Sequence, residues 1–448
     1  MPNTSHEEIR YDEVLPTLVN LIISELGQEA LSDNLIFRDA DGIVTFVLRE
    51  DIEKSVKERL SSAIKETLKK YSPEQPIATP SELFDPTLNN KTLDNWELIT
   101  LKNSTRKIYI RYIEKRIIGN DWIRGICKPL EGVPPIVVFS SHKGGVGRST
   151  ALSIAATELS REGKKVLAID LDLEAPGIGG MFHRCENLPL FGTIDYYVEF
   201  GRSDINDQFL NNMCTAITDM PSGGSITVIA AAGKACTEHP ENVIGKISRA
   251  YLESINDING ETYSFLDKTR QMLTDLCRIN TYDVIFIDAR AGLNESTAAT
   301  IQGLGADILF FGVDTPQTWE GYNYFLSHLS RFKSETSLES DWRYKIKMVH
   351  AKAADNQSAL AKYRDKSFDL FASYLYDELE GNETAEGLPD AFSFDLDDPT
   401  APHYAWPIYI SPDFYEFNPI ENNAQLNSDL INPAFGDFIM KLKDRLGL

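Results

Sequence analysis

Hydrophobic and polar positions follow two regimes along this chain of 448 residues, and the change falls near residue 133. Before it, apolar side chains recur with helical spacing over residues 14–26 and 51–71, and short apolar runs stand at 35–37, 43–47 and 107–113. Helical spacing predicts amphipathic helices, and the short runs predict strands, the first two joined as a hairpin. We expect an accessory α+β domain over residues 1–132.

After residue 133, longer apolar runs alternate with helical patterns. The runs lie at 136–139, 165–169, 226–229, 282–287, 308–313 and 346–352. Apolar strands that alternate with helices are typical of a parallel sheet. Residues 133–448 are therefore expected to form an α/β domain, with a mostly parallel central sheet flanked by helices and an acidic C-terminal extension. The helical stretches at 294–304, 317–332 and 435–446 are expected to cover that sheet.

A glycine-rich segment separates the run at 136–139 from a helical pattern that begins at residue 151. After His142 it reads Lys143, Gly144, Gly145, Val146, Gly147, Arg148, Ser149 and Thr150. Glycines let backbone N–H groups converge on phosphate oxygens, and the start of a helix adds partial positive charge. Strand, glycine-rich turn and helix is the context that a phosphate-binding loop requires.

Carboxylates end two of the other apolar runs. Asp170 and Asp172 follow the run at 165–169, and Asp288 ends the run at 282–287. The carboxyl ends of parallel strands share one edge of a sheet, where ligands bind in such folds. The alternative for residues 170–174 alone is a solvated turn. The role of Arg290 stays open between contact with phosphate, contact with a partner and exposure to solvent.

In this order, the three segments resemble the deviant phosphate loop KGGxGK[ST], the DxDxxxP segment and the Walker B strand of the ParA/MinD group of P-loop ATPases. Arg148 stands where that group usually has lysine, and in this it resembles a subgroup that carries KGGVGR. The resemblance runs from about residue 134 to the C-terminus. It implies a P-loop fold with ATP and Mg²⁺ as ligands.

The resemblance also implies roles for the residues that bind the nucleotide and its metal ion. Residues 144–150, including Arg148, would hold the phosphates. Ser149 would bind Mg²⁺, supported by Asp170, and Asp288 would hold the ion through water, which suits a cation that dehydrates reluctantly.

The resemblance implies that two further residues take part in ATP hydrolysis, one within its own chain and one across a dimer. Asp172 would orient the attacking water, and Lys143 would stabilise phosphate charge across an ATP-bound homodimer. His350 stands near the position of the family's adenine-contacting asparagine.

Arg148 affects the expected rate. A guanidinium chelates two phosphate oxygens, but it is bulkier than an ammonium and follows a moving phosphoryl group less well, so we expect slow hydrolysis. The chain is interpreted as an ATPase that works as a dimerisation switch and controls an unidentified protein partner. A non-hydrolysing, ATP-bound regulatory module is the alternative. A bacterial-type tyrosine kinase is less favoured because Tyr404, Tyr409 and Tyr415 are scattered.

The amino-acid composition limits the partners, cofactors and location that can be expected for this chain. A formal net charge of -23 opposes unspecific adhesion of the whole surface to nucleic acid or to anionic membrane. The five cysteines include no CxxC pair, which disfavours a structural zinc, a disulfide framework and an iron–sulfur site. We found no signal segment and no apolar stretch long enough to span a membrane, so a cytoplasmic protein without membrane contact is expected.

Two surface features stay open. Residues 101–128 are rich in Lys and Arg, and Lys107, Tyr109 and Arg111 share one face of a predicted strand. That face suits nucleic acid or an acidic partner, although a solvated sheet face is favoured and nucleic acid is only retained as an option. Tyr196, Tyr197, Phe200 and Tyr251 would line a partner surface or, as is more common for such residues, the core.

Overall fold

The computed structural model describes residues 9–50, 52–93, 95–102, 104–116, 119–218, 220, 222–255, 261–332, 341–377 and 391–448. Contacts divide the chain into two compact units, residues 1–123 and 124–448. The predicted boundary lay later, after residue 132. The two boundaries differ because residues 124–127 hydrogen bond within the larger unit: the Cys127 N–H donates to the Gln302 carbonyl at 2.7 Å, and Arg124 donates to the Ser264 hydroxyl at 2.8 Å.

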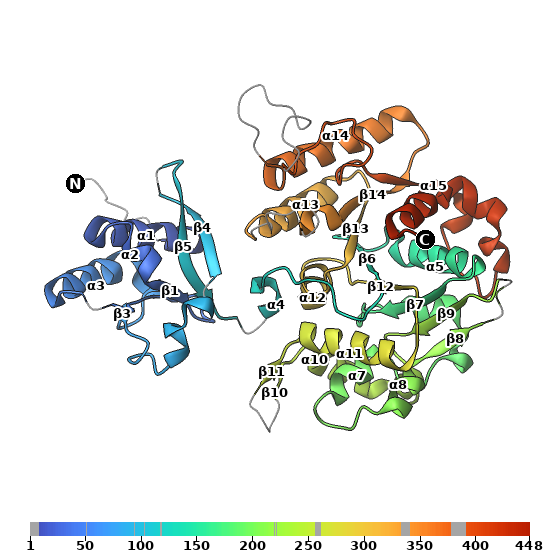
Figure 1. Ribbon diagram of the computed structural model, residues 1–448, viewed down its shortest axis with the longest axis horizontal. Helices are drawn as coiled ribbons and strands as arrows, with labels where there is room; N and C mark the ends of the chain where they lie inside the picture. The colour runs from blue at the N-terminus through green and yellow to red at the C-terminus, as the bar shows by residue number, and fades with distance from the viewer. Residues whose placement is uncertain are drawn as a thin grey trace. The chain divides into compact units, whose positions relative to one another are not determined.

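The first unit is one sheet with two long helices on one face (Figure 1). The strand order is β3-β2-β1-β5-β4. Its strands are β1 (Leu35–Arg38), β2 (Val44–Val47), β3 (Ile77–Ala78), β4 (Asn95–Thr100) and β5 (Lys107–Glu114), and its α-helices are α1 (Tyr11–Leu26), α2 (Ala30–Asp33), α3 (Lys54–Leu68) and α4 (Asn120–Ile123). The antiparallel pairing of β1 with β2 confirms the predicted hairpin.

The predicted helices of this unit are confirmed as α1 and α3. Their apolar stripes, including Leu18 and Leu60, are buried with Phe46 of β2. β4 was not predicted, and it pairs antiparallel with β5 at the edge of the sheet.

The second unit is built on an eight-stranded sheet of order β15-β14-β13-β6-β12-β7-β9-β8. Its strands are β6 (Ile136–Ser140), β7 (Lys165–Asp170), β8 (Thr215–Ile217), β9 (Ser225–Ile229), β12 (Val284–Asp288), β13 (Asp307–Gly312), β14 (Ile346–Ala353) and β15 (Trp406–Tyr409), with β10 (Ser254–Ile255) and β11 (Thr262–Tyr263) paired separately. Only β8 pairs antiparallel within the large sheet, so the predicted α/β fold with a mostly parallel sheet is confirmed.

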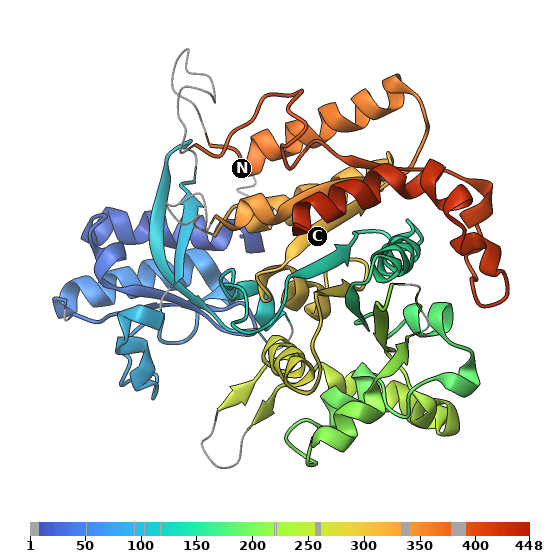
Figure 2. The ribbon, with the colours of Figure 1, turned by 45° about the vertical axis from the view of Figure 1, so that its right-hand side comes forward.

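Helices cover both faces of this sheet (Figures 1 and 2). One face packs against α5 (Arg148–Arg161) and α15 (Ser428–Leu446), and the predicted final helix is thus confirmed as a covering helix, with Phe438 and Leu442 buried. The opposite face carries α7 (Thr193–Glu199), α8 (Asp207–Met213), α10 (Val243–Ala250), α11 (Phe265–Ile279), α12 (Glu295–Gln302), α13 (Pro316–Leu329) and α14 (Gln357–Tyr374). Two short helices, α6 (Ile178–Phe182) and α9 (Lys234–Glu238), follow strand ends.

The aromatic residues that were considered for a partner surface lie in or against the core. Tyr196 and Tyr197 are buried, and the Tyr197 ring stacks on Phe265 with centroids 4.3 Å apart. Phe200 and Tyr251 pack against the same cluster. The partner-surface interpretation was therefore wrong for the two buried tyrosines, because α7 turns both rings toward the helices that cover the sheet.

Strand register brings the predicted acidic residues to one edge. β12 lies between β6 and β7, and Asp288 is aligned with Phe139 on one side and with Asp170 on the other. All three strands are parallel, so the loops that follow them emerge at the same end of the sheet.

Candidate functional site

The glycine-rich segment forms the loop between β6 and the N-terminus of α5. Gly145 and Gly147 have φ angles of 72° and 95°, in the left-handed region that glycine adopts readily. A Cβ built at Gly144, Gly145 or Gly147 meets no atom within 4 Å, so the loop borders open space. Val146 is buried in the core and fixes the loop from beneath. Loop and helix start together present N–H groups to that space, as phosphate binding requires.

Ser149 and Asp288 meet at the start of α5. The Ser149 hydroxyl donates a hydrogen bond to one carboxylate oxygen of Asp288. The other oxygen, Oδ1, is buried and accepts no hydrogen bond from the residues that the structure describes. Burial raises the pKa of Asp288, and the Arg148 guanidinium and the Ser149 hydroxyl oppose that rise. A buried carboxylate oxygen without a donor is a site that a cation, or water bound to one, would satisfy.

Arg148 occupies the space between two of the predicted site carboxylates. Its Nη2 lies 3.4 Å from Asp172 Oδ2, and its Nε lies 3.7 Å from Asp288 Oδ1. The side chain is buried, and Nη1 has no hydrogen-bond acceptor among the described residues. The Arg148 guanidinium, which was predicted to bind phosphate, is therefore paired with carboxylates in this structure. Its Nη1 group is the donor that remains without an acceptor among the described residues.

Asp170 organises the loop that follows β7. Its carboxylate accepts hydrogen bonds from the backbone N–H groups of Asp172 at 3.0 Å, Gly177 at 2.9 Å and Ile178 at 3.1 Å. Burial, reinforced by the charge of Asp288, raises the pKa of Asp170, and the three N–H donors oppose that rise. Asp170 would therefore support a metal ion indirectly, by holding this loop in position.

Asp172 and Lys143 differ in exposure. Asp172 is buried, and its second oxygen accepts the Ala175 N–H at 3.2 Å. The Lys143 side chain is half-buried, and its backbone carbonyl accepts a hydrogen bond from Ser141 at 2.7 Å. The predicted action of Lys143 on a second copy stays a prediction.

The polar groups fit a hydrated magnesium ion bound with a nucleotide. No group of three or more His, Cys, Asp or Glu side chains is arranged to hold a metal ion within the described residues. Mg²⁺ does not need such a cage, because it keeps several waters and uses one or two protein oxygens together with substrate phosphates. Ser149 and Asp288 would supply those oxygens beside the open space of the loop.

A lysine that the sequence did not single out contacts the phosphate loop. The Lys352 ammonium donates to the Gly145 carbonyl at 2.8 Å, although 207 positions separate the two residues. Lys352 has a φ of 51°, a value that residues other than glycine rarely adopt. It lies in β14, two strands away from β6. No local sequence pattern indicates such a contact.

The open question about Arg290 is answered by an ion pair. Its guanidinium donates to the Glu174 carboxylate, and the Tyr251 hydroxyl donates to the other oxygen of Glu174 at 3.0 Å. Glu174 belongs to the loop that carries Asp172. This cluster therefore ties that loop to the strand end after Asp288 and to α10.

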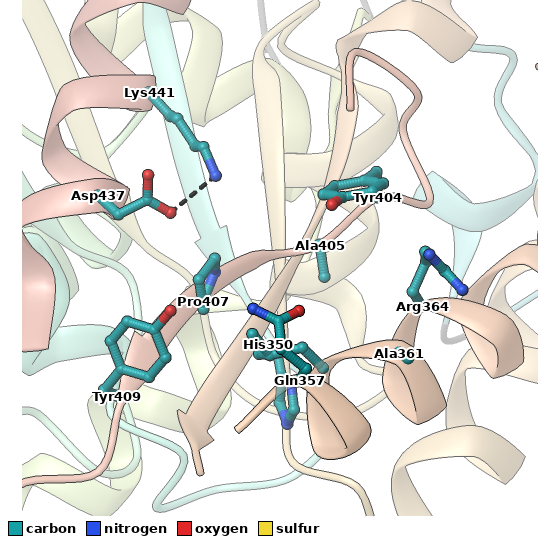
Figure 3. A pocket seen from close by; sticks show the side chains of 11 residues that line it. His350, Gln357, Ala361, Arg364, Tyr404, Ala405, Pro407, Tyr409, Asp437 and Lys441 are labelled. Atoms are coloured by element: carbon teal, nitrogen blue, oxygen red, sulfur yellow. Dashed lines mark hydrogen bonds and ion pairs between the residues drawn. The ribbon is translucent and has the colours of Figure 1, made fainter. Parts of the chain in front are cut away.

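His350 is buried within β14. It is 5% exposed, and its ring stacks on Tyr363 of α14 with centroids 4.0 Å apart. Burial lowers the pKa of His350 to about 4, and the charge of Asp314 opposes that shift. His350 borders a cavity of about 210 Å³ beside β15, whose walls carry Gln357, Arg364, Tyr404, Tyr409 and Lys441 (Figure 3).

A family model and several known proteins match parts of this chain. A family model described as "AAA domain" matches residues 135–340. The mouse cytosolic Fe-S cluster assembly factor NUBP2 is 41% identical over 71 residues, which is 14% of this chain and 26% of that protein. The factor cfd1 of Aspergillus fumigatus is 48% identical over 50 residues, 11% of this chain and 16% of that protein. The chain thus spans about a quarter or less of the length of these relatives.

Among solved structures, that of pNOB8 ParA is 17% identical and covers 70% of this chain and 96% of its own, with a TM-score of 0.41. A ParA family ATPase from Chlorobium tepidum TLS is also 17% identical, covers 54% of this chain and 81% of its own, and has a TM-score of 0.36.

The loop, the two strand ends and the parallel sheet define a P-loop nucleotide-binding domain. Residues 135–340 match the AAA-domain family model, and the loop they contain resembles the deviant Walker A loop of the ParA/MinD-type ATPases, with Arg148 in place of lysine. No helix in the described part of the chain is long and apolar enough to cross a membrane.

Proposed function

We propose that this protein is an ATP-dependent dimerisation switch that hydrolyses ATP slowly in the presence of Mg²⁺ and controls a protein partner or effector. The contact between Ser149 and Asp288 is the observation that carries the proposal. It sets a hydroxyl and a buried carboxylate oxygen that lacks a donor beside the open phosphate loop. Hydroxyl and carboxylate at this place are the oxygens that a magnesium nucleotide needs.

Binding begins with the loop. The N–H groups of residues 144–149 and the N-terminus of α5 would receive the phosphates. The Arg148 guanidinium would turn from Asp172 toward the phosphate oxygens, since phosphate offers its fork two acceptors with a larger charge. Thr150 extends the same helix start. Bound Mg²⁺ supplies charge neutralisation between the phosphates, held at Ser149 and, through water, at Asp288.

The movement of Arg148 would also release Asp172. Once freed from its ion pair, the Asp172 carboxylate would accept a hydrogen bond from a water molecule and orient that water for in-line attack. Asp170 would keep the loop in place. Lys143 of one copy would stabilise phosphate charge on the other, so that hydrolysis depends on the homodimer. Chemistry of this kind consists of positioning and electrostatic stabilisation.

A non-hydrolysing regulatory module is the second candidate. The pairing of Arg148 with Asp172 favours it, because an arginine that keeps this carboxylate occupied in the ATP-bound state would leave no group to orient water. A tyrosine kinase receives little support, because the C-terminal tyrosines form no cluster. Tyr409 ends β15, Tyr404 precedes that strand, and Tyr415 follows it.

The names of the relatives point to different cellular tasks. Those names describe Fe-S cluster assembly for NUBP2 and cfd1, and nonspecific DNA for one pNOB8 ParA complex. The NUBP2 and cfd1 matches cover short segments, and the chain contains no CxxC pair. We therefore propose control of a partner protein, and we do not extend cluster assembly to this chain.

Phosphate release and calorimetry with ATP test the proposal on the full chain. We expect Ser149→Ala to weaken the effect of Mg²⁺ on nucleotide binding by about tenfold to 100-fold. Ser153→Ala is the matched control, since Ser153 lies one turn further along α5 and its hydroxyl contacts Met181. Asp172→Ala and Lys143→Ala should abolish phosphate release while ATP still binds. Release at the wild-type rate from Asp172→Ala, or no heat of ATP binding to the wild type, contradicts the switch.

A further inference from the structure

One side of the β4–β5 ribbon in the first unit faces solvent. Successive side chains alternate between the two sides of a strand, and the antiparallel register aligns Trp96 with Arg111 and Leu98 with Tyr109. Trp96 is 37% exposed, Leu98 38% and Tyr109 50%. We call this side the ribbon face, and it consists of Trp96, Leu98, Thr100, Lys107, Tyr109 and Arg111.

The ribbon face is not part of the core of this unit. The opposite side of the same strands is buried against α1 and α3, through Ile99, Ile108 and Ile110. Further along the sheet, Leu88 covers Leu35 and Val47 on the side of the ribbon face. Leu88 does not bury Trp96 and Tyr109, which keep the exposed fractions given above, whereas Tyr112 of β5 is buried on the opposite side. Large apolar side chains grouped at a surface mark an interaction site more often than an accident of folding.

Positive charge accompanies these rings. Lys107 and Arg111 belong to the ribbon face, whereas Lys102 pairs with Glu13 and Arg116 with Glu114, in a chain whose net charge is -23. The Arg111 guanidinium lies over the Trp96 ring at 4.5 Å and donates to the Ser32 carbonyl at 2.5 Å. A planar cation held flat on an indole extends the stacking surface and keeps its charge at the surface.

We propose that the ribbon face binds single-stranded nucleic acid. Tyr109 and the Arg111–Trp96 pair would stack two successive bases, and Lys107 would contact phosphate. Trp96 and Tyr109 are diagonal neighbours across the two strands, which places them about 7–8 Å apart, too far for one base and suitable for two. Exposed aromatic side chains on an open sheet, with cations beside them, are the means by which proteins bind unpaired strands.

The chemistry of the face distinguishes this partner from an acidic protein segment. An acidic peptide needs cations and gains little from two flat rings in neighbouring positions. A duplex offers phosphates but hides its base faces, so the rings would contribute nothing to its binding. Of these partners, only a single-stranded nucleic acid offers both unstacked bases for the rings and phosphates for the cations. This inference does not rest on the proposed ATP switch.

The test measures anisotropy of fluorescent oligonucleotides of about ten nucleotides, as DNA and as RNA, with the full chain and no added ATP. Tyr109→Ala should weaken binding about fivefold or more, and Tyr109→Phe should retain it, because stacking needs only the ring. Lys107→Gln should weaken binding and reduce its salt dependence. Lys54→Gln is the matched control, an exposed lysine of α3 in the same unit. Far-UV circular dichroism confirms that each variant is folded.

Three outcomes overturn the proposal. The first is no binding of either oligonucleotide by the wild type at low salt. The second is equal affinity for Tyr109→Ala and Tyr109→Phe, which removes stacking from the interaction. The third is tighter binding of duplex DNA or of polyglutamate than of the single strand, which assigns the face to phosphates or to an acidic protein.

Discussion

The guanidinium of Arg148 lies 3.4 Å from the carboxylate of Asp172, and both side chains are buried. The residue proposed to hold phosphate and the residue proposed to orient water thus neutralise each other in this structure. Binding of ATP would exchange this ion pair for a pair between arginine and phosphate. In this scheme, one side chain couples occupancy of the loop to the availability of the carboxylate, and the coupling depends on the fork geometry of arginine.

Replacing Arg148 by lysine tests that coupling. A lysine ammonium is a compact charge that cannot bridge Asp172 and Asp288 with separate nitrogens, so Asp172 becomes free more readily. We expect phosphate release to rise about fivefold, and ATP affinity to stay within about threefold, as for a change near 1 kcal/mol. Phosphate release and calorimetry measure the two effects. Arg161→Lys, at the other end of α5, is the control. Weaker ATP binding by Arg148→Lys would show that the loop is specialised for arginine.

A second prediction concerns Lys352. Its hydrogen bond to the Gly145 carbonyl restrains the phosphate loop, and the loop loses this restraint in Lys352→Met. We expect about threefold to fivefold weaker ATP binding with little change in kcat, and near wild-type binding in Lys352→Arg. Lys362→Met removes another lysine from this part of the unit, one that pairs with Asp314, and serves as control. A loss of kcat at unchanged affinity contradicts a role in shaping the loop.

Much of the larger unit could be predicted because its signals are local. A buried parallel strand is a continuous apolar run, and Gly145 and Gly147 of the loop stand at positions with positive φ. Asp170, Asp172 and Asp288 could be placed at one edge because every parallel strand there ends at the same side. The sequence therefore predicted the fold and the placement of these carboxylates at one edge of the sheet, while their roles stay predictions.

Contacts that depend on the tertiary fold could not be predicted. Lys352 reaches Gly145 across the sheet, and Arg290 meets Glu174 only because β12 lies beside β7. β4 was missed because Asn95–Thr100 lacks a continuous apolar run, and its pairing with β5 stabilises it instead. The unit boundary was placed late because the proline-rich stretch at 129–135 looks like a linker, whereas residues 124–127 already pack on the larger unit.

The pair formed by Arg290 and Glu174 supplies a third prediction. It restrains the loop that carries Asp172, so Arg290→Gln should lower kcat about fivefold while ATP affinity is retained. Glu174→Gln should have the same effect, and the double variant should be no slower than either single variant, because all three break one contact. Single-turnover phosphate release measures each rate. Additive losses would mean that the two residues act on hydrolysis separately.

The buried ring of His350 gives the fourth prediction, which concerns pH. Burial lowers its pKa from 6.5 to about 4 in the folded state. Between these values the unfolded chain holds a proton that the folded chain does not, so the contribution of His350 to stability is complete above pH 6.5 and is lost as the pH falls toward 4. His350→Phe keeps the ring on Tyr363 but cannot titrate. As the pH falls from 6.5 to 4, the free energy of unfolding of His350→Phe should therefore rise by about 2–3 kcal/mol relative to that of the wild type.

Urea unfolding of both proteins at several pH values measures that difference, and other titrating groups cancel because the two chains share them. His239→Gln is the matched control, since His239 is exposed and should show no such divergence. The direction follows from the location of the ring between β14 and α14, where an imidazolium would lose its hydration without gaining a partner for Nδ1 among the described residues. If the two unfolding curves stay parallel from pH 7 to 4, His350 is accessible to water, and its ring is then available to a ligand in the cavity beside β15.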